Sequence, residues 1–314
     1  YRVARFLDIP VVTFEFGDKR EHIWLAQNAE IMRHETDVLW KALGDQPLNE
    51  AQSNQLEEFF SARQDAKAWK NFTRKWQDSP TKGGKAVRKK LKLDDRPVIL
   101  LATNVLGDSL TLDRQVFSQT MAEWVERTVQ FFAEREDVQL VIRVHPGETL
   151  MHGTSMVDVV EAVMPEIPDH IHLVKPEEKV NTYDLISITD LGLVYTTTVG
   201  LEMAMRGIPV VVAGQTHYRN RGFTYDPQSY EDYFVTLNEL LSDLEAARLT
   251  QAQVELSWRY AYLFFFVFPK PFPWHLLDLA EDIHARPMEF VLGEEGSQRY
   301  DETFGFLVGK PITW

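Results

Sequence analysis

The order of apolar and polar positions predicts alternating strands and helices over residues 97–249. Five short runs are apolar almost throughout, at 98–102, 138–144, 171–174, 191–195 and 210–213. Between them, apolar residues recur with helical spacing at 113–135, 155–163, 183–188 and 199–206. Strands that are apolar on both faces are typical of parallel sheets covered by helices on either side. The pattern therefore predicts an α/β domain with a doubly wound parallel sheet.

The first part of the chain has a different pattern. Residues 2–7 are expected to end a helix, and residues 9–16 to form a strand. Residues 21–34 show helical spacing and are predicted to form the next helix. The first residue is Tyr1, and the strand would need partners for its backbone, so we expect upstream strand and helix units to be missing from this sequence. Glu15 and Asp18, at the junction of that strand and helix, are the first acid-base candidates, although acidic residues there are also ordinary helix starters.

Two further segments stand out by composition. Residues 79–96 contain Pro80, two glycines and seven lysines or arginines, which predicts a linker leading into a short basic helix. Residues 258–274 are the most aromatic stretch and end in three prolines. Burial of these rings against another domain is the preferred interpretation. Insertion at a membrane interface, aided by the basic linker, is the alternative and would be a peripheral contact.

Charge and cysteine content limit the function. The net charge of −14 argues against a general nucleic-acid partner, because a phosphate backbone needs a basic face. The chain has no cysteine, which excludes thiol nucleophiles and thiolate zinc sites. No signal peptide or membrane-spanning run is recognisable, so a cytoplasmic location is expected, with association at the inner membrane as an option. The sequence motifs of kinases, dinucleotide-binding enzymes, serine hydrolases and zinc proteases are also missing, and no metal site is expected.

Polar side chains gather where the predicted strands end. The carboxyl ends of parallel strands share one edge of a sheet, and ligands of open α/β sheets bind there. We therefore expect a ligand site at this edge. Its candidate residues are Arg143, His145, Lys175, Tyr195, Thr196, Thr197, Thr198, Gly200, Glu202, His217 and Arg219.

Thr196, Thr197 and Thr198 suggest what the ligand is. They lie between a strand and a helix, where backbone N–H groups and the helix dipole attract anions. One such threonine is by itself an ordinary helix cap, and a single histidine is more often structural than catalytic. Together, the threonines and a cationic His145 with Arg143 could stabilise the departing phosphate of a nucleotide donor without a metal ion.

These residues also carry a resemblance to a family. The segment Arg143-Val-His145-Pro146, with Thr197-Thr198-Val-Gly200-Leu-Glu202 and Gly207-Ile-Pro209-Val, resembles the histidine-proline and serine/threonine motifs of bacterial GT-B glycosyltransferases. The most similar group is the capsular-polysaccharide biosynthesis proteins, which include Kdo transferases. Residues 217–224 resemble a loop of the same group. The resemblance covers residues 98–227 well, and residues 9–34 and the aromatic stretch more loosely.

The resemblance implies a GT-B-like fold with four parts. These are a partial acceptor-side domain (1–78), the linker (79–96), a Rossmann-like domain that binds the nucleotide sugar (97–249), and helices that return across the cleft (250–314). His145, Thr197 and Thr198 would contact the donor phosphate, and Glu202 the ribose. Glu15 and Asp18 remain the candidates for the catalytic base. The glutamate pair of retaining enzymes would need an acid at Val210, so inversion is expected.

The implied activity is transfer of a sugar from a CMP- or UDP-linked donor to a saccharide or glycolipid acceptor during assembly of a bacterial surface polysaccharide. No cofactor other than this nucleotide sugar is implied. Two alternatives stay open. One is a polyol-phosphate transferase or sugar-nucleotide epimerase, and the other is a module that binds a sugar nucleotide without catalysis.

Overall fold

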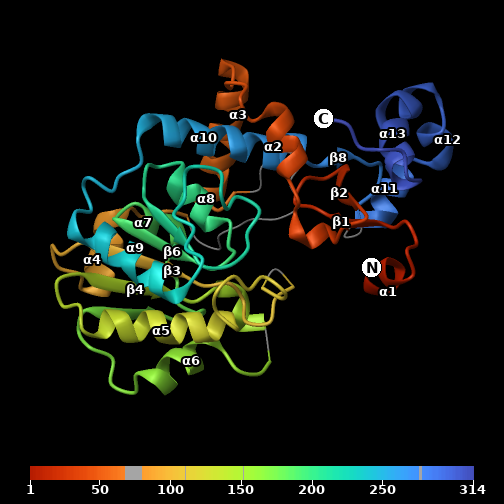
Figure 1. Ribbon diagram of the computed structural model, residues 1–314. Coiled ribbons are helices and arrows are strands. Elements are labelled where there is room, and N and C mark those ends of the chain that lie inside the picture. The colour runs from red at the N-terminus through yellow and green to blue at the C-terminus, as the bar shows by residue number, and fades with distance from the viewer. Residues whose placement is uncertain (68–79, 110, 151, 276–277) are drawn as a thin grey trace. The chain divides into compact units, whose positions relative to one another are not determined.

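The structure is a computed structural model that describes residues 1–67, 80–109, 111–150, 152–275 and 278–314. The chain forms two compact units (Figure 1). Of the described residues, the first unit contains 1–63, Lys67 and 259–314, and the second contains 64–66 and the chain from residue 80 to Trp258. The predicted boundary at 78/79 and the aromatic residues Trp69, Phe72 and Trp76 lie outside the described residues.

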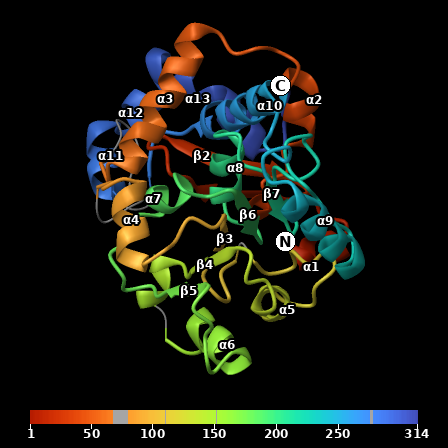
Figure 2. The ribbon, with the colours of Figure 1, turned by 90° about the vertical axis from the view of Figure 1, so that its left-hand side faces the viewer.

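A five-stranded parallel sheet is the centre of the second unit. Its order is β5-β4-β3-β6-β7, as the view along the sheet in Figure 2 shows. The strands are β3 (Val98–Ala102), β4 (Gln139–Arg143), β5 (Ile171–Val174), β6 (Leu191–Val194) and β7 (Val210–Val212). Each predicted strand is present, and every pairing is parallel. The α/β prediction is confirmed.

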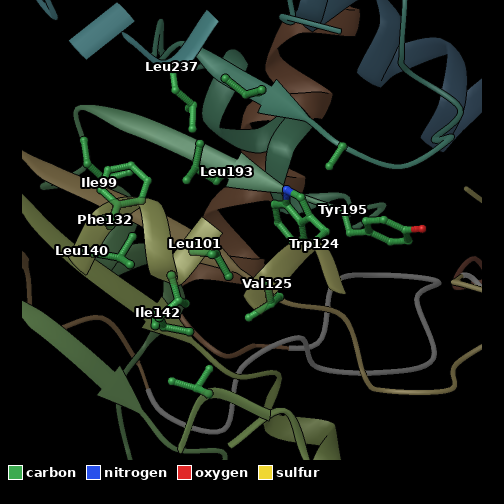
Figure 3. Close-up of a cluster of buried hydrophobic side chains, with 14 of the residues drawn as sticks. Ile99, Leu101, Trp124, Val125, Phe132, Leu140, Ile142, Leu193, Tyr195 and Leu237 are labelled. Carbon is green, nitrogen blue, oxygen red and sulfur yellow. The ribbon is translucent and has the colours of Figure 1, made fainter. Parts of the chain in front are cut away.

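Helices cover both faces of this sheet. On one face, α5 (Met121–Ala133), α6 (Met156–Val163) and α9 (Tyr230–Ser242) pack with the strands in one buried cluster. Figure 3 shows Trp124 and Val125 of α5 against Leu101 and Ile142 in this core. On the other face, Met203 of α8 (Val199–Ala204) lies against Gly192 of β6. That side also has α4 (Gly84–Leu91), α7 (Thr182–Ile186) and the start of α10 (Gln251–Tyr262), whose Val254 lies beside Gly207. The sheet is therefore doubly wound.

The first unit contains a three-stranded sheet that joins distant parts of the chain. β1 (Val12–Phe16) and β2 (His22–Gln27) form an antiparallel hairpin, and β8 (Lys270–Pro271) pairs with β2. Gln27 donates through Nε2 to the carbonyls of Phe306 (2.9 Å) and Lys310 (2.7 Å). The helices of this unit are α1 (Arg2–Phe6), η1 (Ile31–Arg33), α2 (Asp37–Leu43), α3 (Glu50–Gln64), η3 (Leu263–Val267), α11 (Leu279–Ala285), α12 (Met288–Val291) and α13 (Glu294–Leu307).

The helix predicted over residues 21–34 is wrong. Residues 22–27 form β2, in which Ile23 and Leu25 are buried while their neighbours His22 and Trp24 are only partly so. This is the two-residue period of a strand. Glu21 and Asn28, at the ends of the strand, have positive φ values of 57° and 53°. The apolar residues also fit a helical spacing, and pairing with β1 and β8 decided between the two periods.

The aromatic stretch is buried, as preferred from the sequence. Phe265 packs against Phe59 and Phe60 of α3, with ring centroids 5.0 and 5.7 Å apart. Phe264 lies 5.4 Å from the ring of His34, and the hydroxyls of Tyr260 and Thr36 are 2.6 Å apart. These rings therefore form the core of the first unit, and membrane contact stays a prediction. In the described part of the chain, no helix is both long and apolar enough to cross a membrane.

Candidate functional site

Two hydrogen bonds link the ends of three neighbouring strands in the second unit. The N–H of His145, after β4, donates to Oγ1 of Thr103 (3.2 Å), and the N–H of Thr196, after β6, donates to Oδ1 of Asn104 (3.1 Å). Thr103 and Asn104 follow β3, which lies between β4 and β6. The histidine and threonine motifs are therefore not on adjoining strands. They are two strand spacings apart, about 10 Å, and β3 connects them.

His145 is exposed, and its ring orientation is fixed by its own loop. The N–H of Gly147 donates to Nδ1 of His145 at 3.0 Å. A Cβ on residue 147 would lie 2.9 Å from the same nitrogen, so the close approach depends on glycine. Protonation of Nδ1 would place two hydrogens against each other, so the bond favours a neutral ring with its hydrogen on Nε2. With this tautomer, the phosphate contact expected of a cationic ring would be made by a neutral N–H.

Glu148 holds this loop to the loop after β3. Its side chain is buried (8% exposed) and accepts from the N–H of Leu106 (3.1 Å), the hydroxyl of Ser155 (2.6 Å) and the N–H of Met156 (3.0 Å). A buried carboxylate with three donors fixes the relative position of the segments that supply them. Glu148 therefore braces the turn η2 (Pro146–Leu150), which follows His145 directly.

The three threonines lie in a turn that is held at several points. Thr196 is buried, while Thr197 and Thr198 are partly exposed. The hydroxyl of Tyr218 donates to the carbonyl of Thr197 at 2.6 Å, and the N–H of Gly200 donates to the same oxygen at 3.3 Å. The following helix, α8, has only six residues, so its dipole is smaller than that of the helix predicted over residues 199–206. The fixed turn, rather than the helix, is what presents the Thr197 and Thr198 hydroxyls.

Arg219 anchors the loop that follows β7. Its buried guanidinium donates to the carbonyls of Val212, Gly214 and Pro227, and burial lowers its pKa, opposed by the nearby charges of Asp226 and Asp232. Charge-assisted bonds to three carbonyls hold both ends of the loop together. Arg219 therefore holds the loop after β7 in place, and we do not include it among the ligand contacts.

Three other residues that were predicted to contact the ligand interact instead with neighbouring residues of the chain. Arg143 is buried and donates to the carbonyl oxygens of Lys175 (2.8 Å) and Val180 (3.4 Å). Lys175 pairs with Glu161 at 2.8 Å, and the hydrogen bond to that carboxylate raises its pKa. Tyr195 is fully buried beside Trp124 (Figure 3), and burial raises the pKa of its phenol. We leave these three residues out of the proposed site.

Two predicted contacts lie close to the turn. Glu202 is buried in the first turn of α8, where its N–H donates to the carbonyl of Thr198 at 3.2 Å. His217 is partly exposed, and its ring lies 5.1 Å from that of Tyr218. Glu202 and His217 therefore stay predictions for donor contacts.

Glu15 and Asp18 belong to the first unit. Glu15 is exposed on β1, where its own carboxylate accepts from the N–H of Phe16 at 2.9 Å. Asp18 lies in the turn between β1 and β2, so the expected strand-to-helix junction is a hairpin. The acidic pair consequently has no helix N-terminus to stabilise it, and a role as base stays a prediction.

Sequence reasoning missed the two residues that link the strand ends. Thr103 and Asn104 directly follow the apolar run 98–102, so the rule that identified His145 and the threonines applied to them too. Their contacts could not be foreseen, because the position of β3 between β4 and β6 depends on the order of strands in the sheet. Within the described ranges, no cluster of three or more His, Cys, Asp or Glu side chains could hold a metal ion.

Comparison with known proteins gives a family and a fold. The family described as "Capsule polysaccharide biosynthesis protein" matches residues 52–260. The solved structure of KpsC, beta Kdo 2,4 transferase, from Thermosulfurimonas dismutans is similar at 16% identity and a TM-score of 0.51, over 87% of this chain and 77% of that chain. KpsC, beta Kdo 2,7 transferase, from the same organism matches at 15% identity and a TM-score of 0.46, over 82% and 70%. No curated protein matches this sequence significantly. The first of these structures confirms the predicted GT-B-like fold.

Proposed function

Because this chain belongs to the capsule polysaccharide biosynthesis protein family, we propose that it is a glycosyltransferase that moves a sugar from a nucleotide-activated donor to a saccharide or glycolipid acceptor. Family membership was the prediction from the histidine-proline and threonine motifs, and it is confirmed. Donor, acceptor and stereochemistry are parts of the proposal.

One observation carries the proposed donor site. The segments after β4, β3 and β6 are tied together by the bonds from His145 to Thr103 and from Thr196 to Asn104. These bonds support a common position at one edge of the sheet for the His145 ring and the hydroxyls of Thr197 and Thr198. A nucleotide phosphate between them would receive donors from both sides. The α/β topology supports this position, since ligands of such sheets bind at the carboxyl edge.

The proposed chemistry is a displacement at the anomeric carbon of the donor sugar. The bond from that carbon to the phosphate oxygen breaks as the acceptor hydroxyl oxygen attacks, and the acceptor proton moves to a carboxylate base. Glu15 and Asp18 are the candidates for this base. The leaving phosphate gains negative charge, so donors aimed at it stabilise the transition state more than the bound substrate. His145, Thr197 and Thr198 would supply such donors from the chain itself, which favours a reaction without a metal ion. Inversion is proposed because Val210 stands where the glutamate pair of retaining enzymes would need an acid.

A nucleotide screen followed by a transfer assay tests this proposal. Thermal unfolding would be followed with CMP, CDP, UDP and GDP and with their sugar conjugates, because a ligand that binds the folded state raises Tm by several degrees at saturating concentration. Conjugates that bind would then be incubated with saccharide acceptors, and released nucleotide and extended saccharide measured by mass spectrometry. Extended product supports the proposal. Conversion of the sugar nucleotide without acceptor would indicate an epimerase, and binding with neither reaction would indicate a non-catalytic module.

A further inference from the structure

The turn that carries Thr197 and Thr198 is shaped by a buried side chain from the next loop of the chain. Tyr218 is fully buried, yet its hydroxyl reaches the carbonyl of Thr197 at 2.6 Å. This residue lies 21 positions further along, after β7 rather than β6. The bond therefore fixes the backbone of one strand-end segment to the neighbouring one.

The contact requires a glycine in α8. A Cβ on residue 200 would lie 2.3 Å from the Tyr218 hydroxyl oxygen and 2.9 Å from Cγ2 of Val194. Both distances are shorter than real Cβ contacts, so only glycine lets the phenol lie over the start of the helix. Gly200 was predicted to contact the nucleotide. The structure shows a different need for glycine at this position, because a side chain here would occupy the space of the Tyr218 hydroxyl.

The phenol is itself held in place by its neighbour. Arg219 donates to the carbonyls of Val212 and Gly214 at the end of β7 and to that of Pro227 at the far side of the loop. These bonds fix the backbone of the residue that follows Tyr218. The hydroxyl consequently reaches Thr197 from a rigid support.

We propose that Tyr218 is a positioning residue for the donor phosphate, because its hydroxyl fixes the Thr197 carbonyl and thereby the direction of the Thr197 and Thr198 side chains. This inference rests on the proposed donor site. Tyr218 acts through the turn and does not itself touch the nucleotide. Without its bond, the carbonyl of Thr197 keeps the longer contact from the N–H of Gly200, and the turn gains alternative conformations that hold the phosphate less well.

Tyr233 provides a matched control in the same unit. It is also fully buried, and its hydroxyl lies 2.9 Å from Oγ1 of Thr128 in the core between α5 and α9. Tyr218→Phe and Tyr233→Phe each remove one buried hydroxyl without changing the ring. Both should lower stability by a similar amount, but only the first should change the turn that carries the threonines.

The experiment is isothermal titration of the full chain with CMP and UDP, in the parent and in both variants. Tyr218→Phe should weaken nucleotide binding about three- to ten-fold, which corresponds to a large part of one net hydrogen bond. Tyr233→Phe should bind as the parent does. Thr197→Val is then combined with Tyr218→Phe. In the Thr197→Val background, Tyr218→Phe should weaken nucleotide binding less than it does in the parent, because the Thr197 hydroxyl is already gone.

The outcomes separate this inference from the function on which it rests. If the parent binds neither nucleotide nor any sugar conjugate, the donor site itself is wrong, and the role of Tyr218 falls with it. If the parent binds but Tyr218→Phe binds equally well, the donor site stands and the positioning role is wrong. Equal weakening in Tyr218→Phe and Tyr233→Phe, or full additivity with Thr197→Val, would also overturn it, because both results indicate a general effect of lost stability.

Discussion

At the scale of single residues, the bond from the Gly147 N–H to Nδ1 changes what His145 can do. A ring that accepts at Nδ1 presents its hydrogen at Nε2 and acts as a neutral donor without first gaining a proton. A neutral donor can still make a strong bond to a charged phosphate. The contact of His145 with the donor phosphate therefore stays a prediction, with a neutral N–H in place of a cation as the donor.

Replacement of His145 should have a larger effect than replacement of Thr197. His145→Ala removes a bond to a charged group, typically about 1.5–3 kcal/mol, and nucleotide binding should weaken roughly ten-fold or more. Thr197→Val removes one hydroxyl and should cost less, about 0.5–1.5 kcal/mol. His145→Gln, whose amide can donate from a similar distance, should recover part of the loss. Isothermal titration measures all three, on variants with parental thermal unfolding. Parental affinity in His145→Ala would show that the two motifs do not form one site.

At the scale of elements, the position of α8 depends on close contacts with Tyr218 and with β6 that the sequence of the helix does not reveal. Its residues Gly200 and Met203 face the sheet and the Tyr218 phenol, and Met203 in turn fills the space above Gly192 of β6. A six-residue helix makes few hydrogen bonds of its own. Its position is therefore set by these tertiary contacts.

Gly200→Ala should consequently be harmful although alanine is the better helix former. The added Cβ forces Tyr218 away from Thr197, and overpacking of this kind costs about 1–3 kcal/mol. Gly305→Ala in α13 is the matched control, because its Cβ would meet only the flexible end of Lys310, at 3.1 Å. That change should be neutral or stabilising by up to about 1 kcal/mol. Urea unfolding of both variants compares the two glycines. A harmless Gly200→Ala would mean that the phenol can move aside.

At the scale of the whole molecule, the first unit is held together by residues from both ends of the chain. Glu21, beside β2, pairs with Arg286 at 2.8 Å and also with Arg299 of α13. Arg286 pairs with Asp282 of α11 as well. Glu21 is more than two hundred positions away from both arginines, so this unit cannot be complete until its last helices are present.

The partly buried position of His22 makes the stability of this unit depend on pH. Burial, followed by the positive charge of Lys19, lowers the pKa of His22 from 6.5 to about 4, against the opposing effect of the Arg20 carbonyl that its ring contacts. Between these two values the unfolded chain binds more protons than the folded one, so the free energy of unfolding rises with pH. The contribution of His22 is thus complete above pH 6.5 and is lost as the pH falls towards 4.

Thermal unfolding of the parent and of His22→Gln at pH 7.5 and pH 5 measures this effect. Glutamine does not titrate, so acidification should lower Tm more in the parent, by about 2–4 °C. Subtracting the Tm shift of the variant from that of the parent removes the contribution of all other titrating groups. An identical shift in both proteins would show that His22 can be protonated in the folded state.

The sequence by itself determined the local elements of the second unit. Runs such as 98–102 and 191–195 are apolar on both faces and alternate with helical segments, which is typical of a covered parallel sheet. The polar residues that follow such strands emerge at one edge of the sheet. That is why His145 and the threonines could be assigned to a common edge without coordinates. The family resemblance rested on the same residues.

Only the tertiary structure decided which of these residues meet and in which direction they point. The order of strands placed β3, with Thr103 and Asn104, between the two motifs, and it turned Tyr195 into the core beside Trp124. Pairing with β8 from the far end of the chain made residues 22–27 a strand, although their spacing also fitted a helix. The strand order, the direction of Tyr195 and the strand at residues 22–27 could not be predicted for the same physical reason. Periodicity is a property of neighbouring residues, whereas strand order, side-chain direction and the contact of Tyr218 with Thr197 depend on residues that the chain brings together only when it folds.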